Sequence, residues 1–376
     1  DQTMSLVLNE EQLMLRDAAQ SFLSEKAPVA HLRELRDSGN AEGFSRDLWR
    51  DMADMGWPAI LVPEAHGGLD YGYTGLGVIL EECGRTLTPS PLLATALTGV
   101  TALNLAGTED QCAAVLPEIA SGQKFLALAC DESARHEPDR VATEAQDLDG
   151  SFHLNGHKKA VVDGQFAHTF IVSAWSGAGV SLFLVPADTP GLTVERVPAL
   201  DTHVMASVVL DNVEVPADSL LGKLDGGQEP LDQILDATRI GQSAELLGVA
   251  QEAFERTMDY LKERKQFGVP IGGFQALQHR AAALFGEIEL CKSVVLKALQ
   301  ELDSGTGDLA EMASLAKAKA SEVAHLATTE AIQMHGGIGV TDDFDIGFFL
   351  KRCRVLESLY GDRYFHLDRY ARLRGY

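Results

Sequence analysis

The segment around Glu245 has the residue types of a buried general base. Gly241 lies four residues before Glu245 and Gly248 three residues after it, so on a helix all three share one face. Two glycines inside a long helix cost roughly 1 kcal/mol each relative to alanine, so they indicate close packing or room beside a side chain. The apolar neighbours would suit the carboxyl to proton abstraction. The alternative is a solvated glutamate beside packing glycines, and spacing alone favours that alternative.

Two further segments have the composition of a nucleotide site. Residues 264–268 (RKQFG) place a guanidinium and a planar ring at a predicted helix end, where they could contact a phosphate. The simpler interpretation is an arginine that complements the helix dipole before a Gly-x-Pro stop. Residues 333–339 (QMHGGIG) contain three glycines, more than a helix cap requires, so their backbone amides could hold an anion or a nucleotide edge. A plain cap and turn is equally compatible with that segment.

Other chemistry has little support in the sequence. There is no GxGxxG after a predicted strand, no Walker loop, no HExxH and no GxSxG. The 11 histidines show no metal-ligand spacing, so no metal site is predicted. The arginines of residues 351–372 predict a solvated or salt-bridged face, and a phosphate contact at a subunit boundary is the alternative.

Composition excludes several classes of partner. The formal charge of −24 argues against nucleic acid and anionic membranes, which need a basic face. The most apolar stretch, residues 92–107, is interrupted by polar residues and is shorter than the roughly 20 residues of a membrane helix. The 5 cysteines are scattered without a CxxC pair, which predicts free buried thiols. No secretory signal pattern precedes the first helical run, so we expect a cytoplasmic protein.

The elements that position these residues fall into three predicted segments of an α+β multidomain fold. Residues 1–122 have helical periodicity, beginning with a cap at Asn9. Residues 123–226 contain short β-branched runs between turns such as Asn155-Gly156, typical of an antiparallel barrel or sandwich. Residues 227–376 predict a four-helix bundle. Its expected helices are 231–262, 272–303, 308–335 and 346–372.

Three motifs in this order resemble the acyl-CoA dehydrogenase family. They are RKQFG at 264–268, FQALQHR at 274–280 and QMHGGIG at 333–339, and the likeness extends over nearly the whole chain. The closer resemblance is to the branch of pimeloyl-CoA dehydrogenase small subunits and steroid side-chain acyl-CoA dehydrogenases, which ends in a segment like Leu359-Tyr360-Gly361-Asp362.

The resemblance implies a cofactor, a reaction and partners. FAD would lie between the subunits of a dimer, and dimers would pair into a homotetramer or an α2β2 heterotetramer. An acyl-CoA would lose its α-proton to a base and its β-hydrogen as hydride, and an electron-transfer flavoprotein would receive the electrons. By motif matching, Arg264 would contact the pyrophosphate of the neighbour's FAD and Phe267 its adenosine. The same nucleotide end would be lined by Gln275, Gln333, Gly336 and Gly337.

The position of the base departs from the family pattern. The commonest branch carries it in a Tyr-Glu-Gly-Thr segment, but here Tyr360 is followed by Gly361, and Asp362 is displaced and shorter. The isovaleryl-type branch has a glutamate where this chain has Thr238. This chain resembles the small-subunit branch, whose members carry a glutamate at the position of Glu245. We therefore predict Glu245 as the base.

The predicted β segment also departs from the family. The Thr-Glu-Pro-Gly-Ala-Gly-Ser-Asp loop is replaced at residues 131–138, and the flavin-facing Trp-Ile-Thr is replaced by residues 160–162 (AVV). These losses leave three functions open. The first is a complete dehydrogenase, and the second is a partner subunit that completes its neighbour's FAD site. The third is related chemistry such as an oxidase or a desulfinase.

Overall fold

The computed structural model describes residues 6–376. The chain forms two compact units by backbone packing. The first unit contains the residues up to Glu34 together with Gly77–Thr88 and Arg239–Tyr376. The second contains Leu35–Leu76 and Pro89–Thr238. Helices before and after the sheet confirm the predicted helical, β, helical order.

The helices before the sheet begin with the predicted cap. The Asn9 side chain accepts a hydrogen bond from the Gln12 N–H at 2.8 Å, and the Gln12 side chain returns one to the backbone of Asn9. The segment Leu92–Gly99 is a π-helix, a rare form that is frequent at functional sites. The helices are α1 Glu10–Lys26, α2 Val29–Asp37, α3 Arg46–Asp54, η1 Trp57–Ala59, η2 Glu64–His66, α4 Tyr73–Thr86, η3 Leu92–Gly99, α5 Val100–Ala106 and α6 Glu109–Ala120.

The middle of the chain is one twisted sheet with a buried core. Its strands are β1 Leu126–Ala129, β2 Glu144–Leu148, β3 Ser151–Val162, β4 Thr169–Trp175, β5 Val180–Pro186, β6 Leu192–Pro198, β7 Val204–Pro216 and β8 Leu220–Leu221. The order is β6-β7-β3-β2-β4-β5-β8, with β1 beside β4. Most pairs are antiparallel as predicted, but β1 and β2 run parallel to β4. Inward-facing residues such as Phe170 and Phe183 fill the core.

One predicted turn in the sheet was wrong. Asn155-Gly156 indicated a turn between two strands, yet β3 continues through it and pairs with β7 on both sides. The pairing register shifts between Leu154 and Gly156, so the glycine accommodates an irregularity within a strand. A Cβ at Gly156 would lie 2.2 Å from the Thr143 hydroxyl, which explains why the strand needs glycine there.

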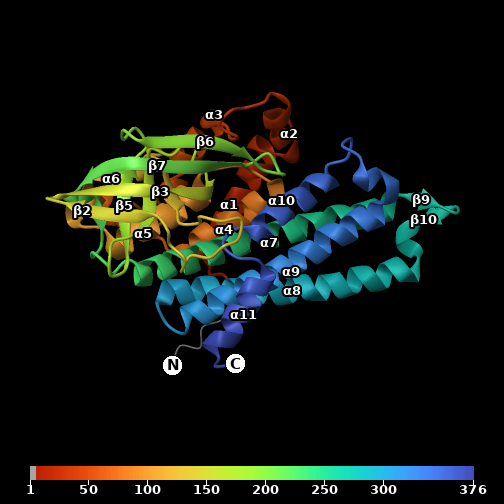
Figure 1. Ribbon diagram of the computed structural model, residues 1–376. Helices are drawn as coiled ribbons and strands as arrows, with labels where there is room; N and C mark the ends of the chain where they lie inside the picture. Colours follow the sequence, from red (N-terminus) through yellow and green to blue (C-terminus); the bar gives the residue numbers. More distant parts are fainter. Residues whose placement is uncertain (1–5) are drawn as a thin grey trace. The chain divides into compact units, whose positions relative to one another are not determined.

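The C-terminal segment, drawn in Figure 1, has one more α-helix than predicted. It contains α7 Gln228–Glu263, the hairpin β9 Lys265–Gln266 and β10 Val269–Pro270, η5 Ile271–Gly273, α8 Gln275–Ser304, α9 Leu309–His335, η6 Gly336–Val340, α10 Ile346–Ser358 and α11 Arg363–Leu373. The expected helix over residues 346–372 is divided into α10 and α11, because Tyr360 and Gly361 adopt left-handed conformations, with φ of 57° and 101°.

Two glycines bring α4 and α7 into backbone contact. A Cβ at Gly84 of α4 would lie 2.1 Å from the backbone oxygen of Glu245. A Cβ at Gly248 of α7 would lie 1.8 Å from the backbone oxygen of Glu81. Neither position can therefore hold a larger residue without separating the helices. Gly248 thus serves helix packing, as one of the two sequence interpretations expected.

Ion pairs connect the helices of the first unit around this contact. Arg85 of α4 pairs with Glu252 of α7 at 3.0 Å, and Glu252 also accepts from Arg256 at 2.8 Å. Asp345, at the start of α10, lies 3.8 Å from Arg256 and 2.9 Å from Arg33 of α2. The segment that follows the glycines of 336–339 is therefore held to α2 and α7 by charge.

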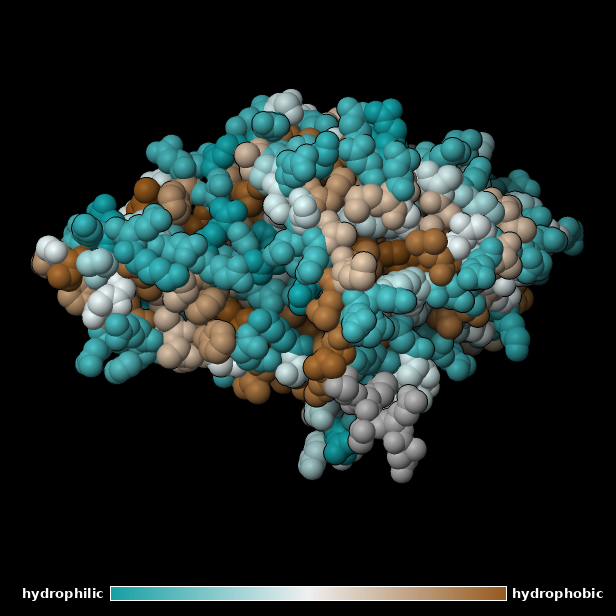
Figure 2. Space-filling model, turned by 180° about the vertical axis from the view of Figure 1, so that it is seen from behind, coloured by the Kyte–Doolittle hydropathy of each residue, from teal (hydrophilic) through white to brown (hydrophobic). Residues whose placement is uncertain are grey.

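The surface is mostly hydrophilic, with apolar patches between the polar residues on the face drawn in Figure 2. Exposed apolar side chains include Phe285 and Leu290 of α8 and Leu367 of α11. All 5 cysteines are buried thiols outside any disulfide, as predicted. Within residues 6–376, no helix is both long and apolar enough to cross a bilayer.

Glu82 makes stability depend on pH. Burial raises the pKa of Glu82 to about 7, and nearby Arg85 opposes the shift. The folded chain therefore holds a proton that the unfolded chain, with a pKa of 4.5, has released. The stabilisation is complete below pH 4.5 and is lost as the pH rises to about 7.

We expect Glu82→Gln to raise the free energy of unfolding above pH 7 by up to about 3 kcal/mol and to change it little at pH 4.5. Urea denaturation at both pH values measures this. Glu255→Gln is the matched control, since Glu255 pairs with the same Arg85 but is half-exposed, and it should cost below about 1 kcal/mol. A gain for Glu82→Gln that is equal at both pH values would contradict the prediction.

Candidate active site and nucleotide-binding edge

Glu245 lies inside the helical bundle and is paired with a cation. It is 5% exposed on α7, and its Oε1 accepts a hydrogen bond from Arg352 Nε of α10 at 2.8 Å. Arg352 is equally buried, so the two charges compensate each other away from water. The sequence alternative of a solvated glutamate is therefore wrong. The pair fixes the orientation of the carboxylate, and such pairing is also how structural carboxylates are kept inside proteins.

The residues at the other candidate positions for a base make structural hydrogen bonds. Thr238 is fully buried, donates to the Ile234 carbonyl at 2.8 Å and lies 2.8 Å from the Thr98 hydroxyl of η3. Asp362 caps α11 by accepting from the Phe365 N–H at 2.8 Å. A Cβ at Gly361 would lie 2.4 Å from the Phe365 ring, so a glutamate there requires the ring to move.

The turn between α10 and α11 is held by donors from three helices. The Tyr360 carbonyl accepts from Arg239 Nε of α7 and from His366 Nε2 of α11, each at 3.1 Å. Lys317 of α9 donates to the carbonyls of Leu359 and Gly361, which flank Tyr360. Burial, together with the cations Arg239 and Lys317, lowers the pKa of His366 far below its usual range, so the ring is neutral and its N–H can donate to the carbonyl.

Sequence reasoning singled out neither Lys317 nor the pairing of Arg352. Lys317 lies on the helix face of α9 formed by Ala313, Ala316, Ala320 and Ala324, all buried. A lone lysine on an apolar helix face was the signal that could have identified it. Three other arginines of residues 351–372 agree with the salt-bridged interpretation, since Arg354, Arg363 and Arg372 form ion pairs. Arg369 instead donates to the Ala310 carbonyl and the Ser314 hydroxyl.

The predicted phosphate and adenosine contacts lie on an arm. β9 and β10 form a two-residue hairpin whose turn is Phe267-Gly268, both with positive φ. Figure 1 shows the arm projecting from the end of the bundle where α7 ends and α8 begins. Phe267 is 92% exposed and touches only the edge of Phe274, with ring centroids 6.2 Å apart, among its described ring contacts. Arg264 is exposed at the base of the arm, and Gln275 is exposed as the first residue of α8.

The glycine segment after α9 lies near the base of this arm. His335 stacks on Tyr260 at 4.3 Å, one turn before Arg264, and the Tyr260 hydroxyl donates to the His335 carbonyl at 3.3 Å. Gln333, Gly336 and Gly337 are exposed, and a Cβ at either glycine would meet nothing within 4 Å. The six residues predicted to contact the nucleotide therefore lie exposed at one end of the bundle.

Glu245 is far from this end. It precedes Arg264 by 19 residues on or just beyond one helix, which corresponds to about 28 Å along the axis at 1.5 Å per residue. Within one chain, the predicted base and the predicted nucleotide contacts are therefore separated by about five turns of helix.

The segment at 131–138 in the sheet region is organised by buried charges. Asp131 pairs with His136 at 2.8 Å. Glu132 accepts from the fully buried Lys158 at 2.6 Å and from the Thr143 N–H at 2.9 Å. Burial lowers the pKa of Lys158, and Glu132 opposes the shift. Within 160–162, Ala160 has a φ of 51° at a bulge of β3 and offers no aromatic ring.

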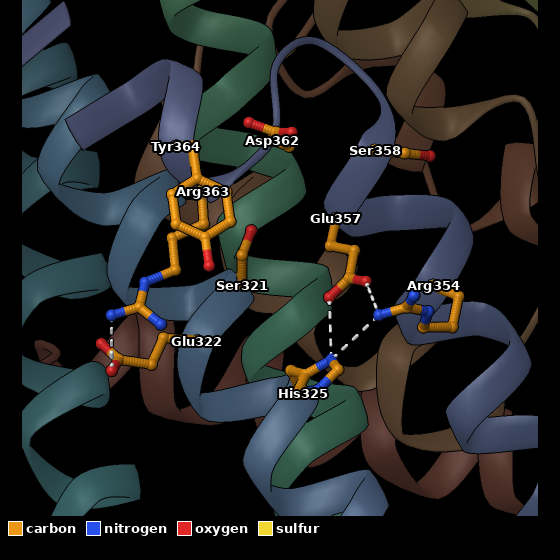
Figure 3. A pocket seen from close by; sticks show the side chains of 9 residues that line it. All are labelled: Ser321, Glu322, His325, Arg354, Glu357, Ser358, Asp362, Arg363 and Tyr364. Carbon is orange, nitrogen blue, oxygen red and sulfur yellow. Dashed lines mark hydrogen bonds and ion pairs between the residues drawn. The ribbon is translucent and has the colours of Figure 1, made fainter. Parts of the chain in front are cut away.

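A separate pocket of about 430 Å³ lies beside the turn (Figure 3). His325 of α9 points towards Arg354 and Glu357 of α10, and Arg363 points towards Glu322. The charges of this pocket are thus largely matched within its own walls. Its lining residues are Ser321, Glu322, His325, Arg354, Glu357, Ser358, Asp362, Arg363 and Tyr364.

Family models match most of the chain. Models of the acyl-CoA dehydrogenase N-terminal, middle and C-terminal domains match residues 9–123, 128–213 and 225–373. The chain is 31% identical over 367 residues to the probable acyl-CoA dehydrogenase YngJ of Bacillus subtilis, covering 94% of this chain and 95% of that protein. It is 28% identical over 361 residues to CarC, a subunit of the caffeyl-CoA reductase-Etf complex of Acetobacterium woodii, covering 93% and 94%.

A solved structure agrees with this similarity. A variant of the Tcur3481–Tcur3483 steroid acyl-CoA dehydrogenase has a TM-score of 0.89 and 32% identity, covering 97% of this chain and 98% of that one. The sequence motifs, the helical, β, helical order and these relatives agree. The chain therefore belongs to the acyl-CoA dehydrogenase family, whose members are FAD-dependent oxidoreductases.

Proposed function

We propose that this chain dehydrogenates the Cα–Cβ bond of an acyl-CoA thioester in an assembly in which each FAD is shared by two subunits, and that an electron-transfer flavoprotein accepts the electrons. The observation that carries the proposal is the separation of about 28 Å between Glu245 and Arg264 along α7. The predicted nucleotide contacts face outward at the bundle's end, so we infer that they serve a neighbouring subunit. CarC, a relative from an Etf complex, supports the electron acceptor.

The exposed end of the bundle fits the nucleotide part of FAD. Arg264 offers a guanidinium for the pyrophosphate and Phe267 a ring 92% exposed for the adenosine. Gly336 and Gly337 leave open space beside the backbone, where a nucleotide can approach closely. When bound, FAD supplies the acceptor for the hydride that leaves Cβ of the substrate.

Within the same proposal, Glu245 takes the α-proton on its carboxylate. Arg352 orients the carboxylate, and burial excludes the water that would otherwise compete for it. Removing the α-proton places negative charge on the thioester oxygen, which backbone N–H donors can stabilise. We assign those donors to the turn at 360–362, because Tyr360 and Gly361 match the segment where the commonest branch carries its base.

A second candidate function is a partner subunit that completes its neighbour's FAD site without turnover of its own. The sheet region favours it, because the Asp131–His136 pair and Ala160 stand where the family pattern has flavin-facing residues. The pairing of Glu245 with Arg352 is also compatible with a purely structural carboxylate. Under this candidate, the companion chain is a homologue that supplies the base and the flavin-facing residues.

A visible absorption spectrum of the chain purified alone tests both candidates. The first predicts a flavin spectrum that an acyl-CoA bleaches anaerobically, in a panel with steroid side-chain, dicarboxylyl, branched and aromatic acyl groups. A colourless protein, or a flavin that no thioester bleaches, would favour the second. Oxygen consumption without an added electron acceptor would instead identify an oxidase.

Two variants of the buried pair separate catalysis from stability. Glu245→Gln should keep flavin but lower kcat by about 100-fold or more, because the amide cannot take up the proton. Arg352→Gln breaks the same pair but keeps the carboxylate, so kcat per bound flavin should stay within about tenfold of wild type. Both should lose about 3–5 kcal/mol of stability at most, measured by denaturation. Equal kcat per bound flavin in both variants would exclude Glu245 as the base.

Mixing inactive subunits tests the shared site. Glu245→Gln and Arg264→Ala homomers should each be inactive, the second through loss of flavin. Refolded together, a mixed dimer has one site with both mutations and one with neither, so about a quarter of wild-type activity should return at random pairing. No recovery in dimers shown to be mixed would place both residues in one subunit's site.

A further inference from the structure

A fully buried lysine holds the turn that joins α10 to α11. Lys317 of α9 is 0% exposed. Its Nζ donates to the carbonyls of Leu356 and Leu359 at 3.0 Å each and of Gly361 at 2.9 Å, with Glu357 O at 3.4 Å. The contacts span the last turn of α10 and the residues beyond it.

These contacts suit an ammonium group. A helix C-terminus leaves carbonyls without partners and carries negative partial charge, so a cation there satisfies both. An ammonium has three N–H bonds to share among these carbonyls, whereas a neutral amine has two. An apolar side chain of similar length would remove the hydrogen bonds that Lys317 makes to these buried carbonyls. Each buried carbonyl left without a partner lowers the stability of the folded chain.

The turn itself is conformationally unfavourable. Tyr360 has a φ of 57°, a conformation that costs free energy for a residue other than glycine and persists only where surrounding contacts compensate for it. Arg239 and His366 fix the Tyr360 carbonyl, and Lys317 fixes the carbonyls on either side of it. Side chains from three helices thus hold this segment through its backbone carbonyls and not through its side chains.

We propose that Lys317 is a positioning residue of the dehydrogenation site, holding the backbone of residues 359–361 in the conformation presented to the thioester. The proposal rests on the proposed function, in which this turn supplies the backbone donors. This role explains why Lys317 contacts the turn although Gly361 has no carboxylate to position.

Titration of Lys317 gives this role a signature. Burial and the charge of Arg239 lower the pKa of Lys317 to about 7, opposed by Glu357, Cys353 and Asp362. His366, which also faces the turn, stays neutral. As the pH rises through 7, the ammonium becomes an amine with one N–H fewer. The turn should therefore loosen, and kcat should fall with rising pH.

Lys317→Met is the test, with Lys319→Met as its control. Lys319 lies on the same helix but pairs at the surface with Glu287, away from the turn. Measurements are kcat and KM between pH 6 and 9, flavin absorbance and amide hydrogen exchange of residues 359–362. Lys317→Met should lose at least about tenfold in kcat at pH 6.5 with KM within about threefold, and exchange should be at least about tenfold faster. Its kcat should also lack the decline near pH 7, and Lys319→Met should match wild type.

The outcomes separate the two proposals. Wild-type kcat with a flavin-loaded Lys317→Met, an unchanged pH profile and unchanged exchange would overturn the role of Lys317 while leaving the dehydrogenase intact. A wild type that turns over no acyl-CoA would contradict the proposed function, and exchange in the turn would still test Lys317. Should Lys317→Met not fold, the wild type decides, since constant kcat and constant exchange protection of the turn across pH 7 would contradict the proposal.

Discussion

The backbone contact between α4 and α7 is the constraint on which the interior of the first unit depends. Gly84 and Gly248 let the two helices touch, each against a carbonyl of the other. Because the contact holds α7 against α4, Glu245 lies inside the bundle, where the buried Arg352 pairs with it. The ion pairs of Arg85, Glu252 and Arg256 then surround the contact and extend it to α10.

The sequence predicted the parts of the fold that local patterns determine. Periodicity identified α7, α8 and α9 to within a few residues, and the Asn9 cap was confirmed because its chemistry is local. The break between α10 and α11 escaped prediction, because the apolar pattern of Val355, Leu356 and Leu359 continues through it. The helix ends where Tyr360 and Gly361 adopt positive φ, and donors such as Lys317, 39 residues away from Leu356 in sequence, hold the resulting turn.

Sequence motifs predicted the exposed part of the candidate site, and they did not predict the buried partner of Glu245. The exposed glycines and the arm follow from motifs, and the structure places them together through the Tyr260–His335 stack. The partner of Glu245 could not be read from spacing, since Arg352 stood among arginines that form surface pairs. Arg352 is the arginine that faces the Glu245 carboxylate. The packing of α10 in the bundle determines this choice, and sequence spacing does not reveal it.

The distance along α7 also bears on how such proteins diversify. Under the proposed function, the chain binds its substrate near the middle of α7, beside Glu245, and supplies nucleotide contacts to a neighbour from beyond the end of that helix, so it contains two separable half-sites. After a gene duplication, one copy can lose either half while the other copy retains it, and the pair still forms a working centre. Subunits with complementary losses then depend on each other for activity. A heteromeric assembly can therefore evolve through loss of residues alone, without any new intersubunit contact.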